Sequence, residues 1–140
     1  MRGFLFEPFL VHWLLVSTNS KPDKLVPHFV LDCSKDVLEN HTEIEVITKV
    51  HETAVASNLF DPKDIKVRMR PYETYLVGGK PNTSFIHVFA DIMEGRTTEQ
   101  KAALSRSMVS LLKGMFPSVP FIAMNVREFE KATYTNLNSL

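Results

Sequence analysis

FIHVFADIMEGRTTEQKAALSRSMVSLLKGMF, residues 85–116, contains two hydrophobic periods in succession. In its first part every second residue is apolar, which is the period of a β-strand, at Ile86, Val88, Ala90 and Ile92. In its second part the apolar residues recur at helical spacing, at Leu104, Met108, Leu111, Leu112 and Met115. Thr97-x-x-Gln100 between the two parts is a capping-box pattern. The stretch therefore predicts a strand that leads directly into an amphipathic helix.

The residues that follow predict a return to strand. Phe116-Pro117 ends the helix, because proline disfavours a helical conformation in the residue before it. The segment from Phe121 to Phe129 is then predicted to be a strand. Together with the preceding stretch it forms one β-α-β unit.

The first half of the chain shows the same order of elements. Alternation around Val30 predicts a strand, and Thr42-x-x-Glu45 predicts a helix cap. The expected inner face of that helix carries Ile44, Ile47, Ala54 and Leu59. Phe60-Asp61-Pro62 ends the helix, and Ile65 to Tyr72 alternates again, with three cations on one face, at Lys66, Arg68 and Arg70.

The two halves predict a tandem duplication. An offset of 58 positions aligns Val30 with Val88 and Val67 with Asn125. The expected fold is α/β (α+β): two β-α-β repeats, about residues 27–77 and 84–130, that form a four-stranded sheet with two helices on one face. The long crossovers make the strands of each unit parallel. Apolar residues such as Val30 and Phe89 lie on both faces of the strands, so we expect the uncovered face to be buried against other subunits.

Composition excludes several classes of protein. The chain has 140 residues, 44% hydrophobic and 23% charged, with 16 basic and 16 acidic side chains, as in an ordinary globular domain. Zero net charge argues against binding to the nucleic-acid backbone. Cys33 is the only cysteine, so neither an intrachain disulfide nor a thiolate zinc site forms, and a cytoplasmic location is expected.

The first 26 residues differ from the rest. The apolar run from Phe4 to Val16 contains Glu7 and is shorter than the roughly 20 residues that a membrane-spanning helix needs. It is also a poor signal peptide, because no small-residue cleavage site follows it. We therefore expect residues 1–26 to be an extension outside the native fold, peripheral to the domain of residues 27–140, and we expect no membrane contact.

The segment that begins at Pro27 resembles a known family. Pro27-His28-Phe29-Val30-Leu31-Asp32-Cys33-Ser34 is similar to the mature N-terminus of 5-carboxymethyl-2-hydroxymuconate isomerases of the tautomerase superfamily. Ile65-Lys66-Val67-Arg68 and Phe85-Ile86-His87-Val88 fall where that family has similar segments. Residues 94–101, Glu-Gly-Arg-Thr-Thr-Glu-Gln-Lys, resemble the strand-to-helix turn of 4-oxalocrotonate tautomerase.

The resemblance implies that Pro27 is the first residue of the working chain and its catalytic base. A proline within a chain has an acylated nitrogen, whereas an N-terminal proline is a secondary amine that can carry protons. An α-amino group titrates near pH 7.7–8, and burial beside cations favours its neutral form. The structural alternative is that Pro27 only begins an edge strand.

The resemblance further implies that cations bind the substrate. It places a substrate-binding arginine at Arg96, where an anion also meets the positive end of a helix. Arg68 and Lys66 occupy the Ile-Arg-x-Arg segment of the family, so Lys66 is a departure that keeps the charge but loses the bidentate geometry of arginine. The structural alternative for Arg96 is a solvated turn arginine, and either Lys66 or Arg68 can take the second carboxylate-binding role.

Other candidate groups are assigned structural roles. The histidines lack metal-ligand spacing and are predicted to lie at the surface or at the core edge: His28, His41, His51 and His87. Cys33 is predicted to be an inert strand thiol, and Tyr72 and Tyr75 are assigned to packing rather than to a pocket. Gly78-Gly79 is a turn. No metal and no cofactor are expected.

The resemblance thus implies a cofactor-independent isomerase that acts as a homotrimer. By resemblance, the substrate is a polycarboxylate dienol such as 5-carboxymethyl-2-hydroxymuconate, from aromatic-compound breakdown of the homoprotocatechuate type, and the product is its 2-oxo tautomer. Two alternatives remain open. The first is a non-catalytic trimeric binding module in which Pro27 stays blocked, and the second is another proton-transfer activity of the superfamily.

Overall fold

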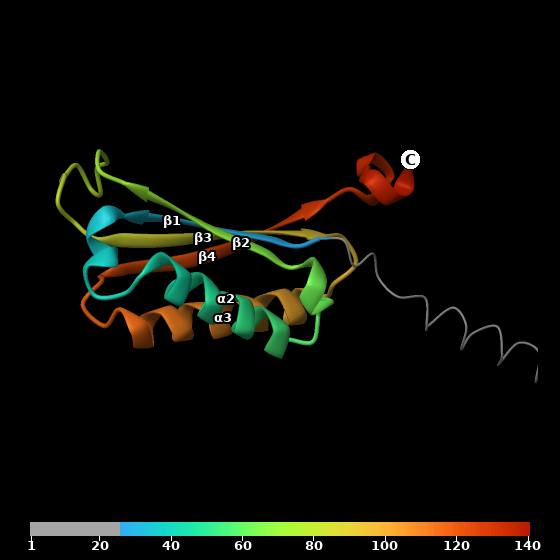
Figure 1. Cartoon of the computed structure of the whole chain (residues 1–140), viewed down its shortest axis with the longest axis horizontal. Helices are drawn as coiled ribbons and strands as arrows, with labels where there is room; N and C mark the ends of the chain where they lie inside the picture. Colours follow the sequence, from blue (N-terminus) through green and yellow to red (C-terminus); the bar gives the residue numbers. More distant parts are fainter. Residues whose placement is uncertain (1–25) are drawn as a thin grey trace, which may run out of the picture.

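The computed structural model describes residues 26–140, and the apolar run Phe4 to Val16 lies outside the described residues. Four strands form one sheet: β1 (His28–Ser34), β2 (Lys66–Tyr72), β3 (Phe85–Met93) and β4 (Phe121–Phe129). Two α-helices, α2 (Glu43–Ala56) and α3 (Thr98–Met115), lie side by side on one face of this sheet (Figure 1). Short 3-10 helices complete the order: η1 (Lys35–Glu39), η2 (Pro62–Asp64), η3 (Lys131–Thr133) and η4 (Leu137–Ser139).

The sheet has the strand order β2-β1-β3-β4. β1 and β2 are parallel, β3 and β4 are parallel, and the two central strands β1 and β3 are antiparallel. This is a mixed sheet built from two β-α-β units, which confirms the predicted architecture. The amino end of β1 and the carboxyl end of β3 therefore meet at one end of the sheet, where His28 is opposite Asp91.

Helix caps form where the sequence predicts them. The Thr42 side chain accepts a hydrogen bond from the Glu45 N–H at 3.2 Å, and α2 begins at the next residue. At α3 both halves of the capping box are present, because Thr97 accepts from the Gln100 N–H at 3.1 Å and Gln100 accepts from the Thr97 N–H at 2.8 Å. These bonds satisfy backbone donors that have no partner within the helix.

The core lies between the helices and the sheet. Alternate residues of the central strands and one stripe of each helix fill it, among them Phe29, Leu31, Val46, Val50, Ile86, Val88, Leu104, Met108 and Leu112. The predicted stripe of α3 is confirmed. That of α2 is wrong in part: Ala54 is buried, but Ile44 is 66% exposed, and Val46 and Val50 take the inward positions.

The predicted 58-residue register is also wrong. Val88 belongs to the core, whereas Val30 lies on the opposite face of its strand from Phe29 and Leu31, which do belong to it. Likewise Val67 packs against the core, while Asn125 contacts His87 on the uncovered face. An offset of one residue exchanges the two faces of a strand. An offset of 57, which aligns Phe29 with Ile86, keeps the faces matched.

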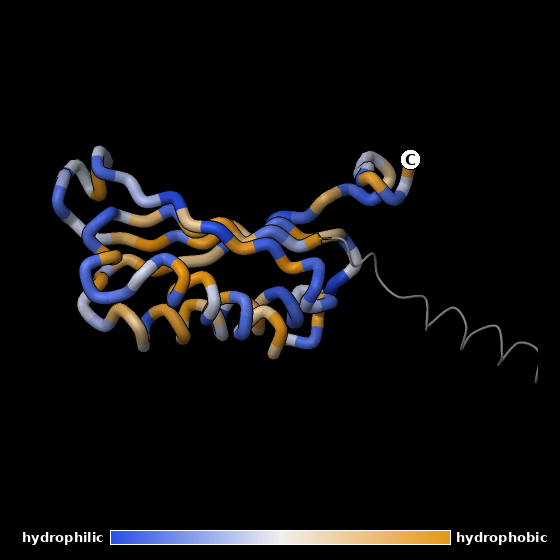
Figure 2. The backbone as a smooth tube through the Cα atoms, viewed as in Figure 1, coloured by the Kyte–Doolittle hydropathy of each residue, from blue (hydrophilic) through white to orange (hydrophobic). Residues whose placement is uncertain are grey.

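The face of the sheet away from the helices, which we call the open face, combines apolar and charged residues. Both Val30 and Phe89 lie on it, and Figure 2 shows hydrophobic residues along strands as well as helices. Two directly opposed ion pairs cross its parallel strands: Arg70 Nε to Asp32 Oδ1 at 2.9 Å, and Arg127 Nε to Asp91 Oδ1 at 2.7 Å. The prediction that both faces carry apolar residues is confirmed.

Candidate active site

Pro27 lies directly before β1 and is buried. Its carbonyl oxygen accepts a hydrogen bond from the Lys66 N–H at 3.1 Å, so the parallel pairing of β1 and β2 begins at this residue. Val26, the residue before it, is also buried. The backbone of Pro27 is therefore held firmly at one end of the sheet.

Two of the predicted cations lie beside Pro27 on β2. Lys66 pairs with His28, and Arg68 follows two residues later on the same face. Arg68 Nη1 donates to His28 Nδ1 at 3.1 Å, while Lys66 Nζ donates to the Asp64 carbonyl at 2.8 Å. Both ammonium and guanidinium groups are thus held at the Pro27 end of the open face.

Burial lowers the pKa of His28, and the positive charges of Arg68 and Lys66 lower it further, whereas Asp91 acts in the opposite direction. Pro27 precedes His28 in the chain and lies near the same cations of β2. An amine in such surroundings loses its proton more readily than one in water, because burial and nearby cations both disfavour its charged form.

The third predicted cation, Arg96, lies in the turn between β3 and α3. Gly95 before it has φ of 121°, which is accessible to glycine, and Thr97 after it caps α3. The Arg96 Nη2 donates to the Leu59 carbonyl, and its Cζ lies 5.3 Å from the centre of the Phe60 ring. Phe60 in turn contacts the core residue Phe29, at 5.9 Å between ring centres. Arg96 therefore lies on the helix side of the sheet.

Only some of the hydrogen-bond donors of the Arg96 guanidinium have acceptors. Its Nη1 is buried and has no hydrogen-bond partner among the residues that the structure describes. Burial also lowers the pKa of Arg96, although an arginine remains charged at neutral pH. A buried donor without an acceptor is costly, and a carboxylate is the acceptor that suits a guanidinium best. The structure thus brings Lys66 and Arg68 together beside Pro27, with Arg96 on the other side of the sheet.

Sequence reasoning missed the contact of His28. The sequence predicts His28 to lie at the surface or at the core edge. The residue is indeed half-buried, but its ring also accepts a hydrogen bond from Arg68. The available signal was its register: as the residue after Pro27 on a strand, it shares a face with Lys66 and Arg68 once the two strands pair in parallel.

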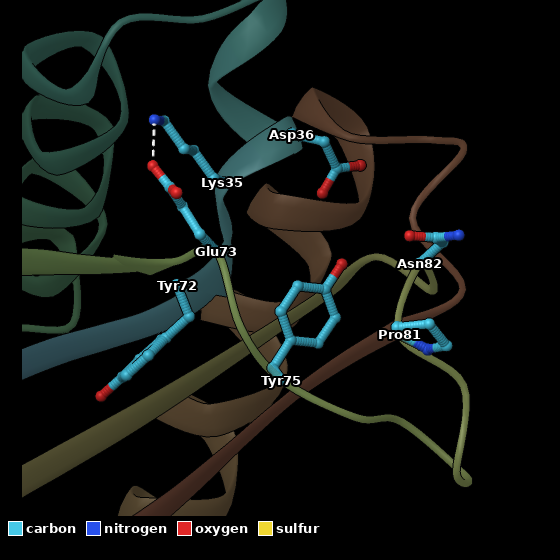
Figure 3. Close-up of a pocket in the computed structure, with 7 residues that line it drawn as sticks. All are labelled: Lys35, Asp36, Tyr72, Glu73, Tyr75, Pro81 and Asn82. Carbon is cyan, nitrogen blue, oxygen red and sulfur yellow. Dashed lines mark hydrogen bonds and ion pairs between the residues drawn. The ribbon is translucent and has the colours of Figure 1, made fainter.

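The assignment of Tyr72 and Tyr75 to packing was also incomplete. Both line a pocket of about 350 Å³, with Lys35, Asp36, Glu73, Pro81 and Asn82 (Figure 3). Its residues lie at or after the carboxyl ends of β1 and β2. The pocket is therefore at the far end of the sheet from Pro27. Within it Lys35 forms an ion pair with Glu73, and Asp36 accepts a hydrogen bond from the nearby Ser84 hydroxyl.

The remaining candidates from the sequence are the Cys33 thiol, a metal site and a membrane-spanning segment. Cys33 is buried, and burial raises the pKa of its thiol to about 12, with nearby carboxylates adding to the effect. Among residues 26–140, no group of three or more histidine, cysteine and acidic side chains is arranged to hold a metal ion. Within the same residues, no helix is long and apolar enough to cross a membrane.

Comparison with known proteins identifies the family of this chain. A model of the family described as 5-carboxymethyl-2-hydroxymuconate isomerase matches residues 27–140. The chain belongs to the 5-carboxymethyl-2-hydroxymuconate isomerase family. It is accordingly an isomerase, and the family resemblance of the sequence is confirmed. The match begins at Pro27, the residue before β1.

Similar proteins include one curated sequence and several solved structures. The Escherichia coli 5-carboxymethyl-2-hydroxymuconate Delta-isomerase is 24% identical over 95 residues, which cover 67% of this chain and 75% of that protein. The crystal structure of a 5-carboxymethyl-2-hydroxymuconate isomerase from Deinococcus radiodurans R1 has a TM-score of 0.70 at 21% identity, covering 81% of this chain and 90% of the other. A fused 4-OT wild-type symmetric trimer has a TM-score of 0.68 at 16% identity, covering 81% and 94%.

Proposed function

We propose that this isomerase converts a 2-hydroxymuconate-type dienol, 5-carboxymethyl-2-hydroxymuconate or a close analogue, to its 2-oxo tautomer in aromatic-compound breakdown. The secondary amine of Pro27 takes the proton of the 2-hydroxyl group and returns a proton to carbon 5. The reaction moves one proton from oxygen to carbon and shifts the double bonds, so it requires no cofactor. The observation that carries the proposal is the position of Pro27 beside Lys66 and Arg68 in a chain of this family.

The base needs a free amine, which requires removal of residues 1–26. We therefore propose that the working protein is the domain of residues 27–140. The environment that lowers the pKa of His28 supports a neutral Pro27 amine near pH 7. A base whose pKa lies near the working pH is the most effective proton acceptor.

The carboxylates of the substrate are bound by Arg96, Arg68 and Lys66 in this proposal. Arg96 Nη1 has no partner among the described residues, and because it is buried, the side chain must turn outward before Nη1 can donate to a carboxylate oxygen. The adjacent N-terminus of α3 favours an anion. Arg68 and Lys66 stabilise the charge that develops on the 2-oxo oxygen. We further propose a homotrimer whose subunits cover the open face, as the apolar residues there and the trimeric 4-OT relative suggest.

The test compares two proteins that differ by one residue. A chain that begins at Pro27 has a free secondary amine, whereas a chain that begins at Val26 has the same fold with the Pro27 nitrogen acylated. The hydrophobic core cluster, from Phe29 to Phe116, is present in both chains, and the two differ only in the buried Val26. Intact mass confirms each N-terminus, and the conversion of the dienol is followed by its ultraviolet absorbance.

We expect isomerase activity from the Pro27 chain and a loss of at least about a hundredfold from the Val26 chain, the scale of general-base catalysis. Pro27→Ala in the shorter chain keeps a primary amine and should retain partial activity. Equal activity of the Val26 and Pro27 chains would refute the proline base. Absence of activity from all of them, with the fold intact, would favour the alternative of a non-catalytic binding module.

A further inference from the structure

The contact between Arg68 and His28 fixes the protonation of the imidazole. Arg68 Nη1 lies 3.1 Å from His28 Nδ1. A guanidinium has only donors, so Nδ1 must accept, and the single ring proton of the neutral imidazole is on Nε2. A doubly protonated His28 has no acceptor and cannot make this bond.

The groups that face His28 favour this neutral form. On β2 these are Arg68 and Lys66, which lower its pKa together with burial. On β3 Asp91 is opposite His28 and acts in the other direction, but Arg127 of β4 binds both of its carboxylate oxygens, at 2.7 and 3.1 Å. The β4 side also contributes the uncharged ring of Phe129, at 6.4 Å between ring centres.

We propose that His28 is a positioning residue that holds Arg68 at the Pro27 end of the open face, ready for a carboxylate of the substrate. The inference rests on the proposed function. In the neutral state, the imidazole orients one end of the guanidinium fork and leaves its other donors available. Protonation of His28 turns Nδ1 into a donor and adds a positive charge that repels the Arg68 guanidinium, so Arg68 is released from its position. Substrate binding is thus coupled to the protonation of a residue that does not touch the reacting atoms.

Two substitutions of His28 distinguish its role as a hydrogen-bond acceptor from its change of protonation. His28→Asn keeps an oxygen acceptor near the position of Nδ1 and does not titrate. His28→Leu introduces an apolar side chain of similar size that has no acceptor. His51→Gln is the matched control, because His51 bonds the Pro62 carbonyl through Nε2, a contact that glutamine can replace, and lies on α2 away from Arg68.

The first measurement uses nuclear magnetic resonance on the full chain. The ¹⁵N shifts of His28 should show the Nε2–H tautomer at pH 7.5 and a pKa below 6.5. Arg68→Leu should raise that pKa, because it removes a neighbouring positive charge. A His28 ring with its proton on Nδ1 at pH 7.5, or a pKa that Arg68→Leu leaves unchanged, would overturn the inference. This measurement requires neither a substrate nor a catalytically active protein.

The second measurement is the affinity for adipate, a saturated six-carbon dicarboxylate, between pH 5.5 and 7.5. In the full chain Pro27 has no titrating amine, so changes in this range arise elsewhere. At pH 7.5 His28→Leu should bind adipate about tenfold more weakly than the unmodified chain, the scale of one lost hydrogen bond to a charged group, and His28→Asn about equally well.

As the pH falls below 6.5, the affinity of the unmodified chain and of His51→Gln should fall relative to that of His28→Asn. Equal adipate affinities of His28→Leu and the unmodified chain at pH 7.5 would overturn the positioning role. So would an adipate affinity of His28→Asn that changes with pH in the same way as that of the unmodified chain. If neither the full chain nor the chain beginning at Pro27 binds adipate, the substrate class of the proposed function is wrong. The resonance measurement then still decides whether His28 holds Arg68.

Discussion

Replacing Arg96 with alanine distinguishes a substrate-binding arginine from one that only stabilises the fold. In the fold, its hydrogen bond to the Leu59 carbonyl contributes about 1.5–3 kcal/mol, because the donor is charged. Its position over the Phe60 ring adds about 0.5–2 kcal/mol. The buried, unpaired Nη1 opposes both with a cost of about 1–3 kcal/mol. The free energy of unfolding of Arg96→Ala should therefore fall by only about 1–2 kcal/mol.

The effect on catalysis should be larger. A carboxylate bound by the unused donor is lost in the variant, and kcat/KM should fall about ten- to a hundredfold, which corresponds to roughly 1.5–3 kcal/mol. The assays are urea unfolding at a fixed protein concentration and dienol isomerisation, both on the chain that begins at Pro27. Arg106→Ala, on an exposed position of α3, is the matched control and should change neither quantity. A loss of more than about 3 kcal/mol of stability with unchanged kcat/KM would refute a substrate-binding role.

Three further outcomes are expected. Lys66→Arg should keep or raise kcat/KM for the dienol, because arginine retains the charge and adds bidentate geometry, and a tenfold fall would contradict a carboxylate at this position. Thr97→Ala should lower the free energy of unfolding by about 1 kcal/mol, through loss of the capping box, while Thr97→Ser should not. Because the thiol of Cys33 has a pKa of about 12 in the fold and ionises near 9 when unfolded, its contribution to stability is complete below pH 9 and is lost as the pH rises toward 12. Urea unfolding from pH 7 to 10.5 should show this alkaline loss in the unmodified chain and a smaller one in Cys33→Ala.

The sequence predicts the elements of this fold well because each strand and helix has one face in a dry core. β4 runs from Phe121 to Phe129, as its alternation predicts, and α3 buries the predicted stripe. The register of the duplication fails for a physical reason. Val30 and Phe89 are apolar residues of the open face, so hydrophobicity alone does not tell the two faces of β1 and β3 apart. The same ambiguity misplaces Ile44, an apolar residue on the outer side of α2.

The candidate site is less predictable, because its contacts join segments that are distant in the sequence. Pro27 and its neighbouring cations were found through family resemblance, and pairing of β1 with β2 explains why they meet. The contacts of Arg96 depend on where the chain leaves α2, since Leu59 and Phe60 lie just beyond that helix. His28 has no motif of its own. Only the parallel register gives it Arg68 as a partner.

The positions of the cations also bear on assembly. Arg96 lies on the helix side of the sheet against Phe60, whereas Arg68 and His28 lie on the open face. On a lone chain the open-face contacts are exposed to water, where hydrogen bonds and ion pairs of charged groups contribute least. A second copy that covers Phe89 would also reduce the solvent around Arg68, and the attraction of the Arg68 guanidinium for a carboxylate would increase. The proposed trimer and the proposed binding of a polycarboxylate therefore support each other, because the same burial that stabilises the assembly strengthens the site.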